Sequence, residues 1–218
     1  MHERPRLRGG GAATAAGAVL LTLTGCSVRA STGTYVGDPS VAAVAQQVGS
    51  EGRTAYYLGP EAGGLALTDV TRVPDNGPDF QVWASYGSCL QAAFDDGGCV
   101  DPISVSTMDW RPDGTGVTCQ RLEPQLGVPA VLLSGELILF TGRAQVSVLD
   151  ARGPADDDGH RGLALLKDLR AIGAGSPVGT LPPPDPEVTH WVDDFCGTVP
   201  GQTVDHPIGE ETAPSAAP

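Results

Sequence analysis

Two histidines next to acidic residues are the side chains best suited to proton transfer or metal binding. His160 follows the acidic run 156–158, and His190 precedes Asp193 and Asp194 at the spacing of one helix face. Imidazole and carboxylate groups in such proximity can transfer a proton or bind a metal ion. However, the helix dipole favours acidic residues at a helix start, and His–Asp pairs are ordinary on exposed helix faces. We therefore interpret both groups as solvated.

The motifs of common enzyme classes are absent from the sequence. It contains no G-x-S-x-G, C-x-x-C or H-E-x-x-H pattern, the signatures of common serine hydrolases, thiol oxidoreductases and zinc proteases. Lys167 has Ala164 three positions before it and Asp168 directly after it, so it completes neither an S-x-x-K pair nor a phosphate-binding loop. We predict a non-enzymatic protein without catalytic residues, metal or cofactor. A secreted hydrolase with an unrecognised site is the alternative.

The first 25 residues have the order of an export signal. Arginines between residues 4 and 8 precede an apolar run over 11–24, which is shorter than the roughly 20 residues of a membrane-spanning helix. The run ends in Leu23-Thr24-Gly25-Cys26, which resembles the lipobox of bacterial lipoproteins. The resemblance implies cleavage before Cys26, diacylglyceryl modification of its thiol, and anchoring at the extracytoplasmic face of the cell membrane. The alternative is a plain cleaved leader that releases a soluble protein.

Four further cysteines remain in the exported chain: Cys89, Cys99, Cys119 and Cys196. An even number in an exported protein indicates two disulfides, and three pairings are open. We favour Cys89–Cys99 with Cys119–Cys196, because the first pair brackets a short loop rich in Asp and Gly. A zinc site is less favoured, since there is no C-x2-C pair and His190 lies on a different element from three of the sulfurs.

Acidic residues outnumber basic ones, 26 against 13, and the formal net charge is −13. Such a surface repels nucleic acid, which is a poor candidate partner. The expected contacts are with the membrane, through the acylated cysteine, and with an envelope protein or cell-wall component.

Short β-type runs bounded by turn residues begin after Arg53. Ala130–Leu133, Glu136–Thr141 and Ala144–Leu149 are the clearest, and the turns Ser134-Gly135 and Gly142-Arg143 predict an antiparallel meander. Further strands are predicted at Thr54–Leu58, Leu65–Val70, Phe80–Tyr86, Ile103–Thr107 and Val117–Leu122. Aromatic side chains are expected mainly in the core, with a ligand pocket among them as the alternative: Tyr56, Tyr57, Trp83, Tyr86 and Trp110.

Three helices are predicted around these strands. The first starts at Pro39 after the N-cap residue Asp38, and the second covers about 159–172. The third has Asp185 as N-cap and Pro186 as first residue, and its apolar face is too small to fold alone. It must pack on the main domain, which is the reason to expect Cys196 to bond to Cys119.

The predicted fold class is α+β: a single small domain with an antiparallel β meander, a helix packed after it, and peripheral short helices. The predicted segments are a signal peptide (1–25), a lipid anchor and spacer (26–37), the α+β domain (38–175), a Pro-rich linker (176–186), a docked helix (187–196) and a disordered tail (197–218).

Several short fragments within residues 55–172 form a set: 56–59 (YYLG), 65–68 (LALT), 86–89 (YGSC), 97–99 (GGC) with Pro102, 127–130 (GVPA) and 140–142 (FTG). Together they resemble a group of uncharacterised actinobacterial lipoproteins and membrane-anchored proteins. The group has no established activity, so the resemblance implies no catalytic residue. It does support the Cys89–Cys99 pairing, because both cysteines lie inside the similar fragments.

Overall fold

The computed structural model describes residues 39–73, 80–88, 90–91, 99–112, 117–153 and 158–206 of the 218-residue chain. The predicted leader, Cys26 and the predicted spacer lie outside the described residues, as does Cys89. Of Cys99 only the backbone is described, where it pairs with Gln91. The predicted Cys89–Cys99 disulfide therefore stays a prediction.

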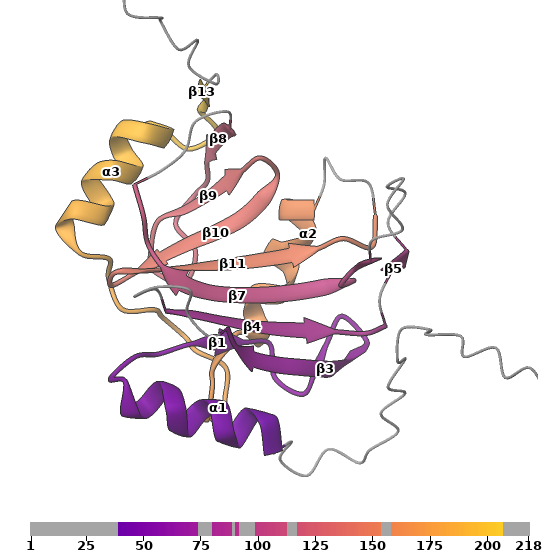
Figure 1. Ribbon diagram of the computed structural model, residues 1–218. Coiled ribbons are helices and arrows are strands. Elements are labelled where there is room, and N and C mark those ends of the chain that lie inside the picture. The colour runs from indigo at the N-terminus through magenta and orange to yellow at the C-terminus, as the bar shows by residue number, and fades with distance from the viewer. Residues whose placement is uncertain are drawn as a thin grey trace, which may run out of the picture. The chain divides into compact units, whose positions relative to one another are not determined.

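A nine-stranded antiparallel sheet forms the centre of the fold and confirms the α+β class (Figure 1). Its spatial order is β13-β8-β9-β10-β11-β7-β4-β3-β2. The strands are β2 (Glu61–Ala62), β3 (Leu65–Arg72), β4 (Gln81–Tyr86), β7 (Ile103–Asp109), β8 (Val117–Arg121), β9 (Ala130–Leu133), β10 (Glu136–Thr141), β11 (Ala144–Asp150) and β13 (Thr203–His206). Two small ladders pair β1 (Tyr56–Tyr57) with β12 (Arg170–Ala171), and β5 (Leu90–Gln91) with β6 (Cys99–Val100).

The predicted meander is present as β9, β10 and β11. Ser134 and Gly135 both have positive φ, 50° and 89°, which is the backbone of a two-residue hairpin turn that follows strand twist. The second turn joins Thr141 to Ala144 through Gly142 and Arg143. Both turns match the sequence prediction.

Three α-helices in the described residues cover the two faces of the sheet: α1 (Pro39–Ser50), α2 (Asp158–Leu165) and α3 (Pro186–Cys196). Side chains alternate along a strand, so Leu137 and Leu139 point to one face of β10 while Ile138 and Phe140 point to the other. The first pair packs in the main core with side chains from α1 and α2, and the second pair packs under α3. In Figure 1, α3 lies beside β8 and α1 beside β3.

The predicted Cys119–Cys196 disulfide is confirmed, and it fixes the end of α3 to the sheet. The two Cα atoms lie 5.2 Å apart, and both side chains are fully buried. The side chain of Trp191 stacks on Phe195 at 4.7 Å between ring centroids, and Phe195 stacks on His206 of β13 at 3.5 Å. The side chains between α3 and the sheet therefore form a second hydrophobic core.

Two sequence expectations differ from the structure. The second helix is shorter than predicted: α2 is followed by one 3-10 turn (η2, Leu166–Asp168), and Leu169 is extended with φ −62° and ψ 131°. The four-residue spacing between Leu165 and Leu169 fits a helix. However, the two residues after Leu169 form β12 and pair with β1, so the helix does not continue. Gly159 allows α2 to pack closely against the β9–β10 hairpin, because a Cβ atom at this position would lie only 2.2 Å from Leu132 Cδ2.

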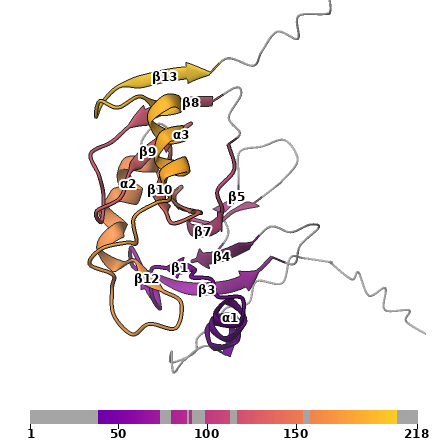
Figure 2. The same cartoon turned by 90° about the vertical axis from the view of Figure 1, so that its left-hand side faces the viewer.

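The second difference concerns the segment after Cys196, which was expected to be disordered. Residues 203–206 form β13 and pair with β8 at the sheet edge, in register with Val204 opposite Cys119 (Figure 2). The disulfide brings the chain to that edge, and the ring nitrogen of His206 lies 2.7 Å from the carbonyl oxygen of Phe195. Residues 207–218 lie outside the described part.

The Pro-rich segment, predicted as a linker, is hydrogen-bonded to the β10–β11 turn. The Pro183 carbonyl accepts a hydrogen bond from Gly142 N, and Asp185 N donates to the Gly142 carbonyl. Leu181 is buried. Asp185 occupies the predicted N-cap position of α3, although its side chain makes no capping hydrogen bond.

Candidate functional site

A cavity of about 210 Å³ lies where four distant parts of the chain meet at one end of the sheet. Residues 52–54, between α1 and β1, line it together with Tyr56 of β1. Phe80 comes from the start of β4, and residues 141–144 form the β10–β11 turn. Pro182 closes the wall from the Pro-rich segment. The short ladders and backbone bonds described above are what place these segments together.

Tyr56 and Thr141 are neutral polar residues of the lining, and both form hydrogen bonds. The backbone amide of Tyr56 donates to Thr107 Oγ1 at 2.9 Å, and the Thr141 hydroxyl donates to the Pro182 carbonyl at 2.8 Å. Burial raises the pKa of the Tyr56 phenol, and its hydrogen bond to Thr141 offsets part of that rise. The phenol therefore stays protonated at neutral pH and offers a neutral hydroxyl.

Among the described residues that line the cavity, the charged side chains are Arg53 and Arg143. Arg53 forms a bidentate pair with Asp109, with Nη1–Oδ1 at 2.7 Å and Nη2–Oδ2 at 2.9 Å. Arg143 is 66% exposed, and its Nη2 atom lies 4.0 Å from Oε2 of Glu187, which is 69% exposed. The first arginine is thus held in one orientation, while the ion pair described for the second is long and exposed.

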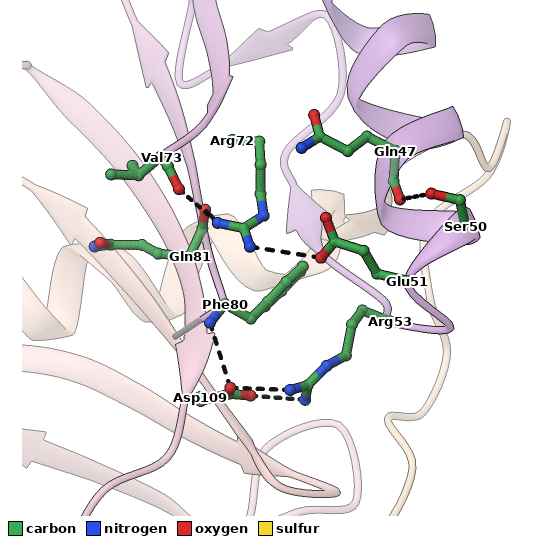
Figure 3. Close-up of polar contacts among 9 residues, drawn as sticks. All are labelled: Gln47, Ser50, Glu51, Arg53, Arg72, Val73, Phe80, Gln81 and Asp109. Atoms are coloured by element: carbon green, nitrogen blue, oxygen red, sulfur yellow. Dashed lines mark hydrogen bonds and ion pairs between the residues drawn. The ribbon is translucent and has the colours of Figure 1, made fainter. Parts of the chain in front are cut away.

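A cation–π cluster supports the Phe80 side of the cavity. Figure 3 shows Phe80 between Arg72 and Arg53, whose Cζ atoms lie 5.0 and 5.4 Å from the ring centroid. Arg72 also pairs with Glu51 at 3.5 Å, and the backbone amide of Phe80 donates to Asp109 at 3.3 Å. These contacts connect the end of α1 with β3, β4 and β7, so this wall is held by several elements.

A second arginine cluster, around Asp150, lies elsewhere in the fold. The Asp150 carboxylate is 2% exposed and accepts two hydrogen bonds from Arg152, at 2.8 and 2.6 Å. Arg161 donates to the Asp150 carbonyl at 2.7 Å, and Arg152 also donates to the Gly63 carbonyl. Burial alone would raise the pKa of Asp150, but the hydrogen bonds and charge of Arg152, aided by Arg161, lower it overall. Because its oxygens are already bonded, we interpret this cluster as structural.

The histidine groups considered from the sequence do not line the cavity. His160 is exposed; residues 156 and 157 lie outside the described part, and of Asp158 only the backbone is described. His190 pairs with Asp194 at 3.3 Å, and the side chains are 79% and 68% exposed. This pair is the exposed helix-face pair that the spacing predicted.

The five aromatic residues named from the sequence as core or pocket residues differ in whether they line the cavity. Tyr57, Tyr86 and Trp110 are buried, and Trp83 is half-buried. The hydroxyl of Tyr86 accepts a hydrogen bond from Leu58 N and donates to the Gly59 carbonyl, which is a core role. Of the five, Tyr56 alone is among the described residues that line the cavity.

Neither arginine of the cavity was predicted from the sequence as a functional residue. Gly142-Arg143 was recognised only as a turn. Nothing in the local sequence indicates that Arg53 meets Asp109, 56 residues further along the chain. A basic residue at a tight turn, in a chain with a net charge of −13, was the one available signal.

Searches among protein-family models, curated proteins and solved structures found no match to this chain. In the described part of the chain, no helix is both long enough and apolar enough to cross a membrane. The same residues contain no group of three or more His, Cys, Asp or Glu side chains arranged to hold a metal ion.

Proposed function

We propose that the protein is a lipid-anchored module of the cell envelope that binds a ligand at the extracytoplasmic face without transforming it. The observation that carries this proposal is Leu23-Thr24-Gly25-Cys26 at the end of a charged and then apolar leader. Two acyl chains on one cysteine give stable anchoring, whereas one chain is marginal. The resemblance of residues 55–172 to actinobacterial lipoproteins belongs to the same proposal.

The Cys119–Cys196 disulfide supports an extracytoplasmic location. Disulfides persist in oxidising compartments and are rare in the cytosol. This bond closes a loop with a sequence separation of 77, so its contribution to stability is expected to be substantial. A domain that depends on such a bond is suited to the outside of the membrane.

The chemistry of the cavity supports binding in preference to catalysis. A general base or acid for work near neutral pH is usually His, Asp, Glu, Lys or Cys, and none of these is among the described lining residues. Thr54 and Thr141 supply hydroxyls, but a hydroxyl nucleophile requires an adjacent base. One observation that would favour the hydrolase alternative is a pocket that brings together His160, an Asp of 156–158 and a hydroxyl. His160 is exposed and is not among the described residues that line this cavity.

Anchoring is tested by fractionating cells that express the full chain or its Cys26→Ser variant. We expect the unchanged protein in the membrane fraction, with an acylated Cys26 as its first residue by mass spectrometry. Cys26→Ser should keep its leader or appear in the soluble fraction, whereas the neighbouring Ser27→Ala should behave as the unchanged protein. If Cys26→Ser retains the size and membrane association of the unchanged protein, lipid anchoring at this residue is wrong.

A further inference from the structure

We propose that the cavity between the β10–β11 turn and the Pro-rich segment binds a carboxylate attached to a small apolar group, with Arg143 as its ionic partner. The inference names the ligand class of the binding module proposed above and rests on that function. It does not depend on the anchor, which is tested separately.

The charge around the cavity favours an anion. The chain as a whole has a net charge of −13, yet both charged side chains among the described lining residues are arginines. A hollow lined by one sign of charge concentrates the field that attracts the opposite sign. Asp109 already neutralises Arg53, so the attraction comes mainly from Arg143.

Arg143 can leave Glu187 and pair with a ligand carboxylate at little cost in free energy. Its contact with Glu187 is at 4.0 Å between two exposed side chains, and exposed ion pairs of this kind contribute little to stability. A ligand carboxylate in the cavity mouth would form a shorter, charge-assisted hydrogen bond to the same guanidinium. The Glu187 carboxylate therefore competes with the ligand for one cation.

The backbone that carries Arg143 is held in place before any ligand binds. The carbonyl of Arg143 accepts a hydrogen bond from Trp110 N at 2.8 Å. Its neighbour Gly142 donates to the Pro183 carbonyl at 3.1 Å and accepts from Asp185 N at 2.9 Å. The backbone of the β10–β11 turn therefore needs no further ordering when a ligand binds, which reduces the entropic cost of binding.

The remaining walls set the size and character of the ligand. Phe80, Ala144 and Pro182 offer apolar surface, while Thr54 supplies a hydroxyl among the lining residues. A volume of about 210 Å³ is smaller than the roughly 300–1,000 Å³ of ordinary ligand pockets. It suits a small carboxylic acid or the C-terminal residue of a peptide, and both present the same chemistry.

The test measures binding of four probes to the full chain purified in detergent, by calorimetry or NMR titration. The probes are N-acetylvaline and the tripeptide Gly-Gly-Val, each as the free acid and as the C-terminal amide. We expect at least one free acid to bind about tenfold or more tightly than its amide, since only the acid gains a charge-assisted bond. Binding of N-acetylvaline alone identifies a free small acid, and binding of the tripeptide alone identifies a peptide end. If neither acid binds better than its amide, the inference is wrong.

Three variants locate the effect. Arg143→Gln should abolish most of the preference for the acid, and Glu187→Gln should increase affinity for the acid by removing the competing carboxylate. Lys167→Gln is the matched control, because it removes one exposed positive charge that does not line the cavity. Equal affinities of Arg143→Gln and Lys167→Gln for the acid would overturn the assignment of Arg143. If the acid binds but Cys26→Ser retains the size and membrane association of the unchanged protein, this inference stands and only the lipid anchor is refuted.

Discussion

The Asp150 cluster and the cavity rim use the same residue types for different purposes. At Asp150 the carboxylate is 2% exposed, and hydrogen bonds from Arg152 hold both of its oxygens. At the rim, Arg143 and Glu187 are both largely exposed and separated by 4.0 Å. The first arrangement leaves no group for a ligand, whereas the second leaves an arginine whose partner can be replaced.

Two properties distinguish a structural ion pair from a binding group more than residue type does. They are the burial of the pair and whether its polar atoms already have hydrogen-bond partners. A buried carboxylate that loses its partners carries the full cost of desolvation. An exposed pair can separate at little cost, because water replaces each partner. Arg53 and Asp109 lie between these extremes, with exposures of 39% and 20% and bidentate geometry.

Asp150→Asn should have the largest effect on stability. It removes the charge that Arg152 and Arg161 face, and the free energy of unfolding should fall by about 2–3 kcal/mol. Both arginines retain some solvent access, which keeps the loss below that of a fully buried pair. Urea denaturation measures it, with the exposed Asp194→Asn as matched control, expected within about 0.5 kcal/mol of the unchanged protein. Equal stability of the two variants would contradict the structural role of Asp150.

The stabilising effect of Asp150 should also depend on pH. Its native pKa is lower than the ordinary value of 3.8, so the unfolded chain takes up the proton first as pH falls. The contribution is therefore complete well above pH 4 and is lost as pH falls through the lower native pKa. The difference in unfolding free energy between the unchanged protein and Asp150→Asn should narrow from pH 7 to pH 3. A difference that stays constant over this range would show that the charge is not responsible.

Local patterns predicted much of the fold. Ala130–Leu133 and Glu136–Thr141 have the predicted bounds, because apolar runs and two-residue turns are encoded within a few adjacent residues. The Cys119–Cys196 bond was also predictable. The helix before Cys196 buries too little apolar surface to fold alone and must be attached to the domain.

Contacts between distant backbone segments were not predictable. The Pro-rich segment is held by hydrogen bonds to Gly142, and backbone groups of almost any sequence could form them. The same is true of two other segments. Residues 203–206 are extended because they pair with β8, and the chain leaves the helical conformation after α2 because residues 170–171 pair with β1. The cavity is made from such contacts, so its arginines had no signature in the sequence.

Arg53→Gln should have an intermediate effect. It removes a bidentate pair and leaves the partly buried Asp109 with the Phe80 amide as a weak partner at 3.3 Å. We expect a loss of about 1 kcal/mol in the free energy of unfolding, and a weaker contact on the Phe80 ring. Urea denaturation of Arg53→Gln and Asp150→Asn under the same conditions shows which variant loses more free energy of unfolding. A loss equal to or larger than that of Asp150→Asn would break the proposed ranking by burial.

Arg143→Gln should have the smallest effect on stability, within about 0.5 kcal/mol of the unchanged protein, because its only described ion pair is exposed. The same holds for Glu187→Gln. These two variants therefore separate stability from binding: both should unfold like the unchanged protein, while their affinities for a free carboxylic acid change in opposite directions. Urea denaturation and the acid titration on the same preparations test both statements. A stability loss of more than about 1 kcal/mol for Arg143→Gln would make the arginine part of the structural framework. The contrast with Asp150 would then disappear.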